Sequence, residues 1–196
     1  MSIVRYLALA AVLGFVGCEK MSGGAASAGG SPGGSVAGKP AGADVAATAA
    51  AGGDVKLDLK SSEDLQKLVA SKKGKVVVVD AWSTYCDPCM KEFPGLVGLH
   101  KKYGPEKIAC ISFCMNYVGL GKVEDEIEPV IEFLRKQNAT FDNILSTDED
   151  TMVNKKLGIQ SVPAIFIYDR DGKLVKLINT ETTYAEVEEI VAPLLN

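Results

Sequence analysis

Blocks of apolar residues recur along the chain from about residue 55 onward, and their spacing changes from block to block. V-K-L-D-L alternates apolar and polar positions like a short strand. The next segment, S-S-E-D-L-Q-K-L-V-A, opens with serines suited to cap a helix and places Leu65, Leu68 and Val69 on one face. The run K-V-V-V-V-D-A-W does not alternate, which is typical of a strand covered on both faces. We therefore expect a central, buried strand over 75–82.

The second half of the chain continues the alternation of helices and strands. A helix is expected to about residue 103, a strand over 107–114, a helix over 125–137, a short extra strand over 141–145, and a helix that Gly158 stops. V-P-A-I-F-I-Y and K-L-V-K-L-I-N flank the turn D-R-D-G, which predicts a hairpin, and a final helix spans 184–195. This order predicts one α/β domain over 54–196, with a mixed β-sheet flanked by helices on both faces.

The sequence pattern of the residues before this domain predicts that the protein is exported. M-S-I-V-R-Y supplies one positive charge, and the apolar stretch from Leu7 to Val16 is too short to span a bilayer, so 1–17 is interpreted as a signal peptide. Its end, F-V-G-C, resembles the bacterial lipoprotein processing site, in which Cys18 would receive a lipid, although Phe15 stands where that site prefers Leu. The alternative is an ordinary secretory peptide with an incidental cysteine. The prediction is a location in the bacterial cell envelope, facing the periplasm and lipid-anchored to a membrane through Cys18.

Residues 18–53 contain the anchor cysteine and a stretch made almost entirely of Gly, Ala and Ser. Such a segment lacks the large apolar side chains that offset the entropy of ordering, so a flexible tether is expected. Over the whole chain, a net charge of -4 and a pI near 5.1 leave no excess of basic residues to neutralise phosphates. Nucleic acid is therefore not an expected partner.

Cys86 and Cys89 carry the clearest chemical signal. They lie directly after the buried strand and at the start of a helix, where unpaired N–H groups and the helix dipole favour a thiolate at Cys86. Cys89 is close enough in sequence to form a small disulfide ring with Cys86 and to resolve a mixed disulfide. Asp87 opposes the dipole and favours a more reducing couple, and Pro88 fixes the backbone of the first turn.

Two alternatives apply to any Cys-x-x-Cys pair, namely a zinc site and a structural disulfide. Zinc needs further ligands, and the only histidine is His100, with no second Cys-x-x-Cys nearby. The placement between a strand and a helix therefore favours a redox role, and no metal or other cofactor is expected.

The segment W-S-T-Y-C-D-P-C-M-K-E-F-P resembles the active site of the thioredoxin superfamily, and C-x-x-C-x-x-E-x-P resembles its TlpA/ResA-like branch of exported reductases. The resemblance covers about residues 54–196 and implies a thioredoxin-like fold. It implies that Asp80 exchanges a proton with Cys89, that Trp82 packs beside the site, and that Val162 and Pro163 form a cis-proline pair facing the cysteines. Pro94 matches the proline that bends the active-site helix, and Glu92 matches the acidic residue of the motif.

Each of these positions also has a structural interpretation. Asp80 could cap a turn, and Trp82 could be an ordinary core residue. Glu92 could be a solvated helix residue, and Pro163 could begin a strand. An acid after four valines is costly unless it is paired, which favours a functional Asp80. Substrate contacts are expected from Trp82, Tyr85, Pro88, Val162 and Pro163, with Asp87 and Glu92 as tuning residues.

Two features differ from the common thioredoxin pattern. Tyr85 replaces a frequent tryptophan, and the stretch 116–145 resembles the insertion of TlpA-like proteins, between the active-site half and the cis-proline half.

Cys110 and Cys114 lie about 13 Å apart along a regular strand and cannot bond to each other. Cys110 is interpreted as a small buried apolar residue and Cys114 as a candidate third redox thiol.

The leading prediction is a membrane-tethered thiol-disulfide oxidoreductase that reduces protein disulfides, with apocytochromes c among the substrates that the resemblance implies. A membrane electron donor and a monomeric state are expected. The alternatives are a thiol peroxidase, which normally has an arginine near its cysteine, a Sco-type copper chaperone, which uses two cysteines and a histidine, and a binding module without turnover.

Overall fold

The computed structural model describes residues 54–196. The predicted signal peptide over 1–17, the lipidation site Cys18 and the tether over 18–53 lie outside the described residues. Within 54–196, no helix combines the length and apolar character needed to cross a membrane.

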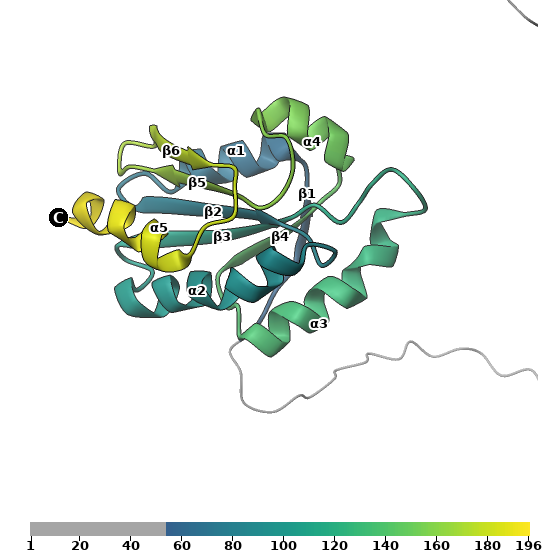
Figure 1. Ribbon diagram of the computed structural model, residues 1–196, viewed down its shortest axis with the longest axis horizontal. Coiled ribbons are helices and arrows are strands. Elements are labelled where there is room, and N and C mark those ends of the chain that lie inside the picture. The colour runs from purple at the N-terminus through teal and green to yellow at the C-terminus, as the bar shows by residue number, and fades with distance from the viewer. Residues whose placement is uncertain (1–53) are drawn as a thin grey trace, which may run out of the picture. The chain divides into compact units, whose positions relative to one another are not determined.

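A six-stranded mixed sheet forms the centre of the domain, in the order β1-β4-β3-β2-β5-β6 (Figure 1). Strands β1, β4, β3 and β2 run parallel, β5 pairs antiparallel with β2, and β6 pairs antiparallel with β5. The strands are β1 (Asp58–Lys60), β2 (Val76–Trp82), β3 (Ile108–Cys114), β4 (Asp142–Ser146), β5 (Ala164–Tyr168) and β6 (Leu174–Ile178). Every residue of β2 is buried, as expected for a central strand with helices on both faces.

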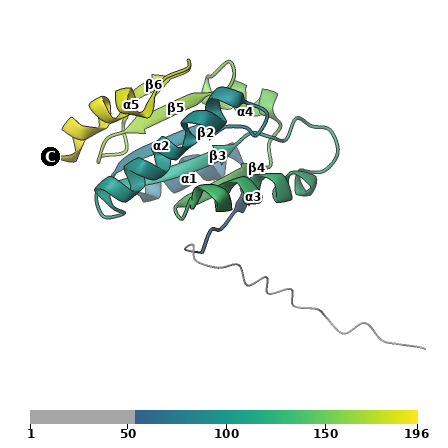
Figure 2. The same ribbon diagram turned by 60° about the horizontal axis from the view of Figure 1, so that its bottom comes forward.

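Five α-helices cover the two faces of the sheet: α1 (Ser62–Ser71), α2 (Asp87–Tyr103), α3 (Ile127–Gln137), α4 (Asp150–Leu157) and α5 (Tyr184–Val191). Figures 1 and 2 show α2, α3 and α5 on one face and α1 and α4 on the other. Side chains alternate along β2 accordingly. Val76, Val78 and Trp82 belong to the apolar cluster under α2, α3 and α5, and Val77 and Val79 belong to the cluster under α1 and α4.

The predicted elements are confirmed, with three differences in extent or position. The first strand is short, because only Asp58–Lys60 pairs with β4. The helix expected from residue 125 begins as a 3-10 helix (Val123–Glu126) before α3 starts at Ile127. The extra strand β4 is internal, since it pairs with both β3 and β1.

Local sequence explains where α5 begins. Thr183 and Glu186 form a capping box, in which the Thr183 hydroxyl accepts from the Glu186 N–H and the Glu186 carboxylate accepts from the Thr183 N–H at 2.9 Å. Tyr184 is therefore held as the first residue of α5, and its side chain is buried.

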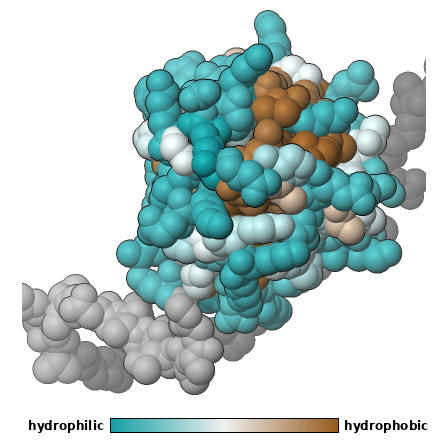
Figure 3. Space-filling model, turned by 90° about the vertical axis from the view of Figure 1, so that its left-hand side faces the viewer, coloured by the Kyte–Doolittle hydropathy of each residue, from teal (hydrophilic) through white to brown (hydrophobic). Residues whose placement is uncertain are grey.

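The β5–β6 hairpin turn lies at the opposite end of the sheet from Trp82, since Tyr168 pairs with Val77 and Ala164 pairs with Ala81. Figure 3 shows this end of the molecule, where apolar side chains gather into a patch bordered by hydrophilic ones. Leu174 and Val175 at the start of β6 are both exposed.

Candidate active site

Cys86 and Cys89 form a disulfide with a Cα–Cα distance of 5.3 Å. Cys86 is the N-cap of α2 and is partly exposed, and its sulfur accepts from the Cys89 N–H at 3.3 Å. Cys89 lies inside the first turn and is 3% exposed. The two sulfurs are thus unequal, because only that of Cys86 lies both at the surface and at the positive end of the helix dipole.

A cavity of about 300 Å³ lies on the buried side of the disulfide and is lined by Asp80, Cys89, Glu92, Pro163 and Tyr184, among others. Asp80 is in β2 and is 3% exposed. Burial raises the pKa of Asp80 to about 6, although a hydrogen bond from Tyr184 acts in the opposite direction. The carboxyl group therefore titrates close to neutral pH and shares a cavity with the buried cysteine.

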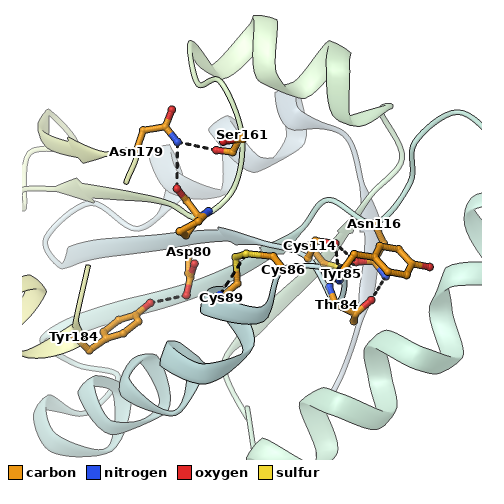
Figure 4. The surroundings of a disulfide bond; sticks show 12 residues. Asp80, Thr84, Tyr85, Cys86, Cys89, Cys114, Asn116, Ser161, Asn179 and Tyr184 are labelled. Atoms are coloured by element: carbon orange, nitrogen blue, oxygen red, sulfur yellow. Dashed lines mark hydrogen bonds between the residues drawn. A yellow bond between two sulfur atoms is a disulfide. The ribbon is translucent and has the colours of Figure 1, made fainter. Parts of the chain in front are cut away.

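Tyr184 donates its hydroxyl proton to the Asp80 carboxyl, with an oxygen–oxygen distance of 2.7 Å (Figure 4). Burial is the largest cause that raises the pKa of Tyr184, followed by the charge of Asp80 and the hydrogen bond to it. Gly95 of α2 makes the approach possible, because a Cβ atom at Gly95 would lie 2.3 Å from the Tyr184 Cβ. A packing feature of two helices thus places a hydroxyl on the buried acid.

The loop before β5 faces the disulfide from the other side of the cavity. The Val162–Pro163 peptide bond is cis, and both residues are partly buried. Asn179 holds this loop, since its amide donates to the backbone oxygens of Ser161 at 2.7 Å and of Pro163 at 3.1 Å (Figure 4). The two anchored carbonyls flank Val162.

A network of hydrogen-bonded polar residues surrounds Asn116, which follows β3 and is 1% exposed. Its side-chain oxygen accepts from the Ser83 hydroxyl at 2.9 Å and from the Thr84 N–H at 2.9 Å. Its amide nitrogen donates to the Thr84 hydroxyl at 2.7 Å and to Glu126 at 2.9 Å. Asn116 therefore joins the loop before Cys86 to the inserted segment.

Tyr85 stands at the surface beside Cys86 and is 72% exposed. Its hydroxyl donates to Glu126 at 3.1 Å. Tyr85 and Val162 both line a surface groove of about 290 Å³, together with Val118 and Asn154. An aromatic side chain and the cis-proline loop thus border one groove next to the disulfide.

The other predicted residues lie around this centre in different surroundings. Pro88 lies in the first turn of α2 and lines the cavity with Glu92, whereas Asp87 and Pro94 are exposed on α2.

Trp82 was expected among the substrate contacts, but it is fully buried, with its ring 4.9 Å from that of Phe93 and 5.0 Å from that of Phe133. A ring without exposed surface cannot contact a partner. Trp82 therefore supports the site from within the core.

Cys110 and Cys114 are free and buried. Burial raises the pKa of Cys110 to about 12 and also raises that of Cys114, whose thiol donates to Asn116 at 3.1 Å. A thiol that stays protonated is a poor nucleophile, which favours a structural role for both. Cys114 nevertheless belongs to the group around Asn116 (Figure 4).

The residues that the alternatives require lie elsewhere in the described chain. His100 packs edge-on against Phe141 and lines a different cavity, together with Lys72 and Asp142. Of the arginines in 54–196, Arg135 lies in the last turn of α3 and Arg170 donates to the Leu195 carbonyl. Within the same residues, no cluster of three or more His, Cys, Asp or Glu side chains is placed to hold a metal ion.

Tyr184, Asn116, Glu126 and Asn179 are the site residues that the sequence did not reveal. A signal existed for Tyr184, because a buried tyrosine hydroxyl and a buried carboxyl both need a partner and can satisfy each other. No local pattern marks Asn116 or Asn179, whose bonds join segments that are distant in sequence.

Curated relatives share about three fifths of their length with this chain. The thiol-disulfide oxidoreductase ResA of Bacillus thuringiensis subsp. konkukian is 31% identical over 117 residues, which are 60% of this chain and 62% of the relative. ResA of Bacillus subtilis is 26% identical over 117 residues, 60% of each chain.

Solved structures support the fold. A thioredoxin family thiol:disulfide interchange protein from Chlorobium tepidum aligns with a TM-score of 0.54 at 23% identity, over 65% of this chain and 84% of its own. A thiol-disulfide isomerase from Corynebacterium glutamicum aligns with a TM-score of 0.56 at 18% identity, over 72% and 95%. The thioredoxin-like fold expected from the sequence is confirmed.

A family model described as Redoxin matches residues 40–192, which include every strand that the structure describes and all of the residues around the disulfide. The sheet order and the cysteine pair at the start of α2 agree with this match, and the chain therefore belongs to the Redoxin family.

Proposed function

We propose that this protein is an exported, membrane-tethered thiol-disulfide oxidoreductase that reduces disulfides of partner proteins through Cys86 and Cys89. One observation carries the proposal. The Cys86–Cys89 disulfide caps α2 with one sulfur at the surface and the other against a cavity that contains Asp80. The names of the curated relatives, which are thiol-disulfide oxidoreductases, support the same activity.

The reaction begins with both cysteines reduced. The Cys86 thiolate attacks one sulfur of the partner disulfide, so that a Cys86–partner bond forms, the partner S–S bond breaks, and the leaving sulfur takes up a proton. The Cys89 thiol then loses its proton and attacks the Cys86 sulfur, which releases the second partner sulfur. The protein ends as the Cys86–Cys89 disulfide and the partner as a dithiol, with two electrons transferred.

Asp80 receives the proton of Cys89 in the second step. Both residues line the same cavity, and a pKa of about 6 lets the carboxyl accept a proton and return it near neutral pH. Glu92 lines the cavity with them, and its charge contributes to the raised pKa of Tyr184.

The groove bordered by Tyr85 and Val162 receives the segment of the partner that carries the disulfide. Tyr85 offers an exposed ring beside the attacking sulfur, and Asn179 fixes the carbonyls on both sides of Val162, so that this backbone is held in place for a partner strand. Asn116 and Glu126 hold the Tyr85 loop in place.

The reductase direction rests on Asp87 and on the TlpA/ResA-like motif. Asp87 is the first residue of α2, where a carboxylate opposes the dipole that stabilises the Cys86 thiolate. A less stable thiolate makes a more reducing couple, which needs a dedicated electron donor. The apolar stretch before Cys18 and the Gly/Ala/Ser-rich tether over 18–53 support export and attachment to a membrane, where such a donor would lie.

Reduction of a disulfide-bonded test protein by the full chain, with dithiothreitol as the electron source, tests this function. Wild type should accelerate the reduction, and Cys86→Ser should fall to the rate with dithiothreitol alone. Cys110→Ala, which removes a buried thiol outside the disulfide, should retain activity. Equal rates with and without wild type protein would reject the proposal.

A further inference from the structure

We propose that Tyr184 is a positioning residue for proton transfer, because its hydroxyl holds the Asp80 carboxyl toward the cavity that Cys89 shares. This inference rests on the proposed function and names a residue that the sequence did not indicate. Its starting point is the hydrogen bond from Tyr184 to Asp80, which joins residues 104 positions apart at 2.7 Å (Figure 4).

Within residues 54–196, the hydrogen bond from Tyr184 is the one side-chain hydrogen bond that Asp80 receives. Ser112 pairs with Asp80 across β2 and β3, but its hydroxyl donates to Asn143 instead. Tyr184 therefore decides how the carboxyl is held, and the charged form of Asp80 depends on it for stabilisation in a buried setting.

The position of Tyr184 is fixed from two directions. The capping box of Thr183 and Glu186 sets the start of α5, and Gly95 leaves room for the ring against α2. A ring held this closely loses little further freedom when its hydroxyl binds Asp80, so the hydrogen bond is preorganised for each catalytic cycle.

Other ionisable groups face the same space and belong to any account of its pH dependence. Helix α2 contributes Cys89, Lys91 and Glu92. Glu181 lies in the loop before α5, Glu186 lies in α5, and the Cys110 thiol lies on neighbouring β3. None of these groups donates a hydrogen bond to Asp80, whereas Tyr184 does. A cavity of about 300 Å³ has room for several waters, through which the proton can leave Asp80 for solvent.

The expected consequence has a definite sign. A hydroxyl that donates to a carboxylate stabilises the charged form, so Tyr184→Phe should raise the pKa of Asp80. Fewer molecules then carry Asp80 as a base at a given pH. The midpoint of the rising pH dependence of the Cys89 attack should move up by about one pH unit, with a rate about tenfold lower well below the midpoint.

The aromatic disulfide 5,5'-dithiobis(2-nitrobenzoate) separates the two steps in the reduced full chain. Attack by Cys86 releases the first coloured thiolate, and attack by Cys89 on the resulting mixed disulfide releases the second. The rate of the second release, measured from pH 5 to 9, should shift in Tyr184→Phe and stay unchanged in Tyr103→Phe. Tyr103 is a matched control, because it donates from α2 to Glu188 of α5, away from Asp80.

Combination with Asp80→Asn distinguishes positioning from a general effect on packing. Tyr184→Phe should add no further shift when Asp80 is already replaced. A second release with an unchanged midpoint in Tyr184→Phe, or an equal shift in the Asp80→Asn background, would overturn the inference and leave the proposed function intact. A wild type that shows no second release would overturn the proposed function, and the inference with it.

If Tyr184→Phe does not fold, 3-fluorotyrosine incorporated in place of tyrosine provides the second test. Its more acidic hydroxyl is a stronger donor and should move the midpoint of the second release to lower pH. An unchanged midpoint in the fluorinated protein would contradict the inference.

Discussion

The two sulfurs of the disulfide lie in contrasting surroundings. Behind Cys89, one buried acid receives one hydrogen bond from a buried tyrosine, next to a cavity. Around Cys86, an exposed tyrosine belongs to a loop that Asn116 ties down with several hydrogen bonds. In the first region, burial and a single hydrogen bond set the pKa of one carboxyl group, whereas in the second a network of hydrogen bonds fixes the conformation of a surface loop.

Under the proposed function, this difference corresponds to a division of tasks. Proton transfer needs a group whose charge changes easily, which a buried carboxyl group with a raised pKa provides. Recognition of a partner needs a loop with a fixed conformation and an accessible side chain, which a dense hydrogen-bond network provides. Variants on the two sides should therefore fail in different ways.

The largest effect is expected from the cysteines themselves. Cys86→Ser and Cys89→Ser should each lower steady-state disulfide reduction on the order of 10³-fold or more, because turnover needs both the attacking and the resolving cysteine. Only Cys89→Ser should accumulate a mixed disulfide, since it keeps the attacking thiolate and loses the resolving one. Mass spectrometry after incubation with a disulfide-bonded peptide would detect the adduct, and an adduct in Cys86→Ser instead would reverse the assignment.

Asp80→Asn should change the pH dependence of stability. The pKa of Asp80 is raised from 3.8 to about 6 in the folded protein, so the native state keeps a proton that the unfolded state has already lost. Stability should therefore fall as pH rises from about 4 through about 6, by about 3 kcal/mol at 1.36 kcal/mol per pH unit.

Denaturant unfolding of the oxidised full chain at pH 4 and pH 8 would measure this effect. Asp80→Asn should be more stable than wild type at pH 8 and similar to it at pH 4. Asp171→Asn, in an exposed turn, is the control and should follow wild type at both values. A wild type whose Asp80-dependent stability rises with pH would contradict the burial argument.

Asn116→Ala should affect the loop beside Cys86 and leave proton transfer at Cys89 unchanged. It leaves the buried Ser83 hydroxyl and the Thr84 N–H without their acceptor, which should cost about 1–3 kcal/mol of stability. Reduction of a partner should show a raised KM, because the Tyr85 loop is less well held, while the midpoint of the second thiolate release stays the same. A shifted midpoint would show that the two regions are coupled.

Tyr85→Ala should have the smallest effect on stability, within about 0.5 kcal/mol, because the side chain is 72% exposed. It should raise the KM for a protein disulfide and leave the reaction with the small aromatic disulfide nearly unchanged. Leu120→Ala is the control, since Leu120 is 80% exposed but does not line the groove. Equal effects of the two variants would reject a specific role for Tyr85.

The sequence was informative where chemistry and local structure coincide. Four consecutive valines before Asp80 predicted the central strand, and the cysteine spacing after it predicted the disulfide at the start of α2. Tyr184 could not be matched to Asp80 from periodicity, because the contact depends on how closely α5 packs over Gly95. The hydrogen-bond network of Asn116 could not be predicted either, since it joins segments that only the folded sheet brings together.

Trp82 shows how a motif can mislead about accessibility. The position beside the cysteines suggested a contact with substrate, yet its place in β2 directs the ring into the core under α2 and α3. Alternation along the strand, which also points Val76 and Val78 to that face, was the better guide.

The equilibrium reduction potential of the Cys86–Cys89 couple in the full chain tests the central claim most directly. Tryptophan fluorescence or thiol trapping in dithiothreitol and glutathione buffers would follow the fraction reduced. We predict a single reversible two-electron couple near the value of thioredoxin, about -270 mV. A potential near about -120 mV would make the protein an oxidant, and the absence of a reversible couple would contradict the account as a whole.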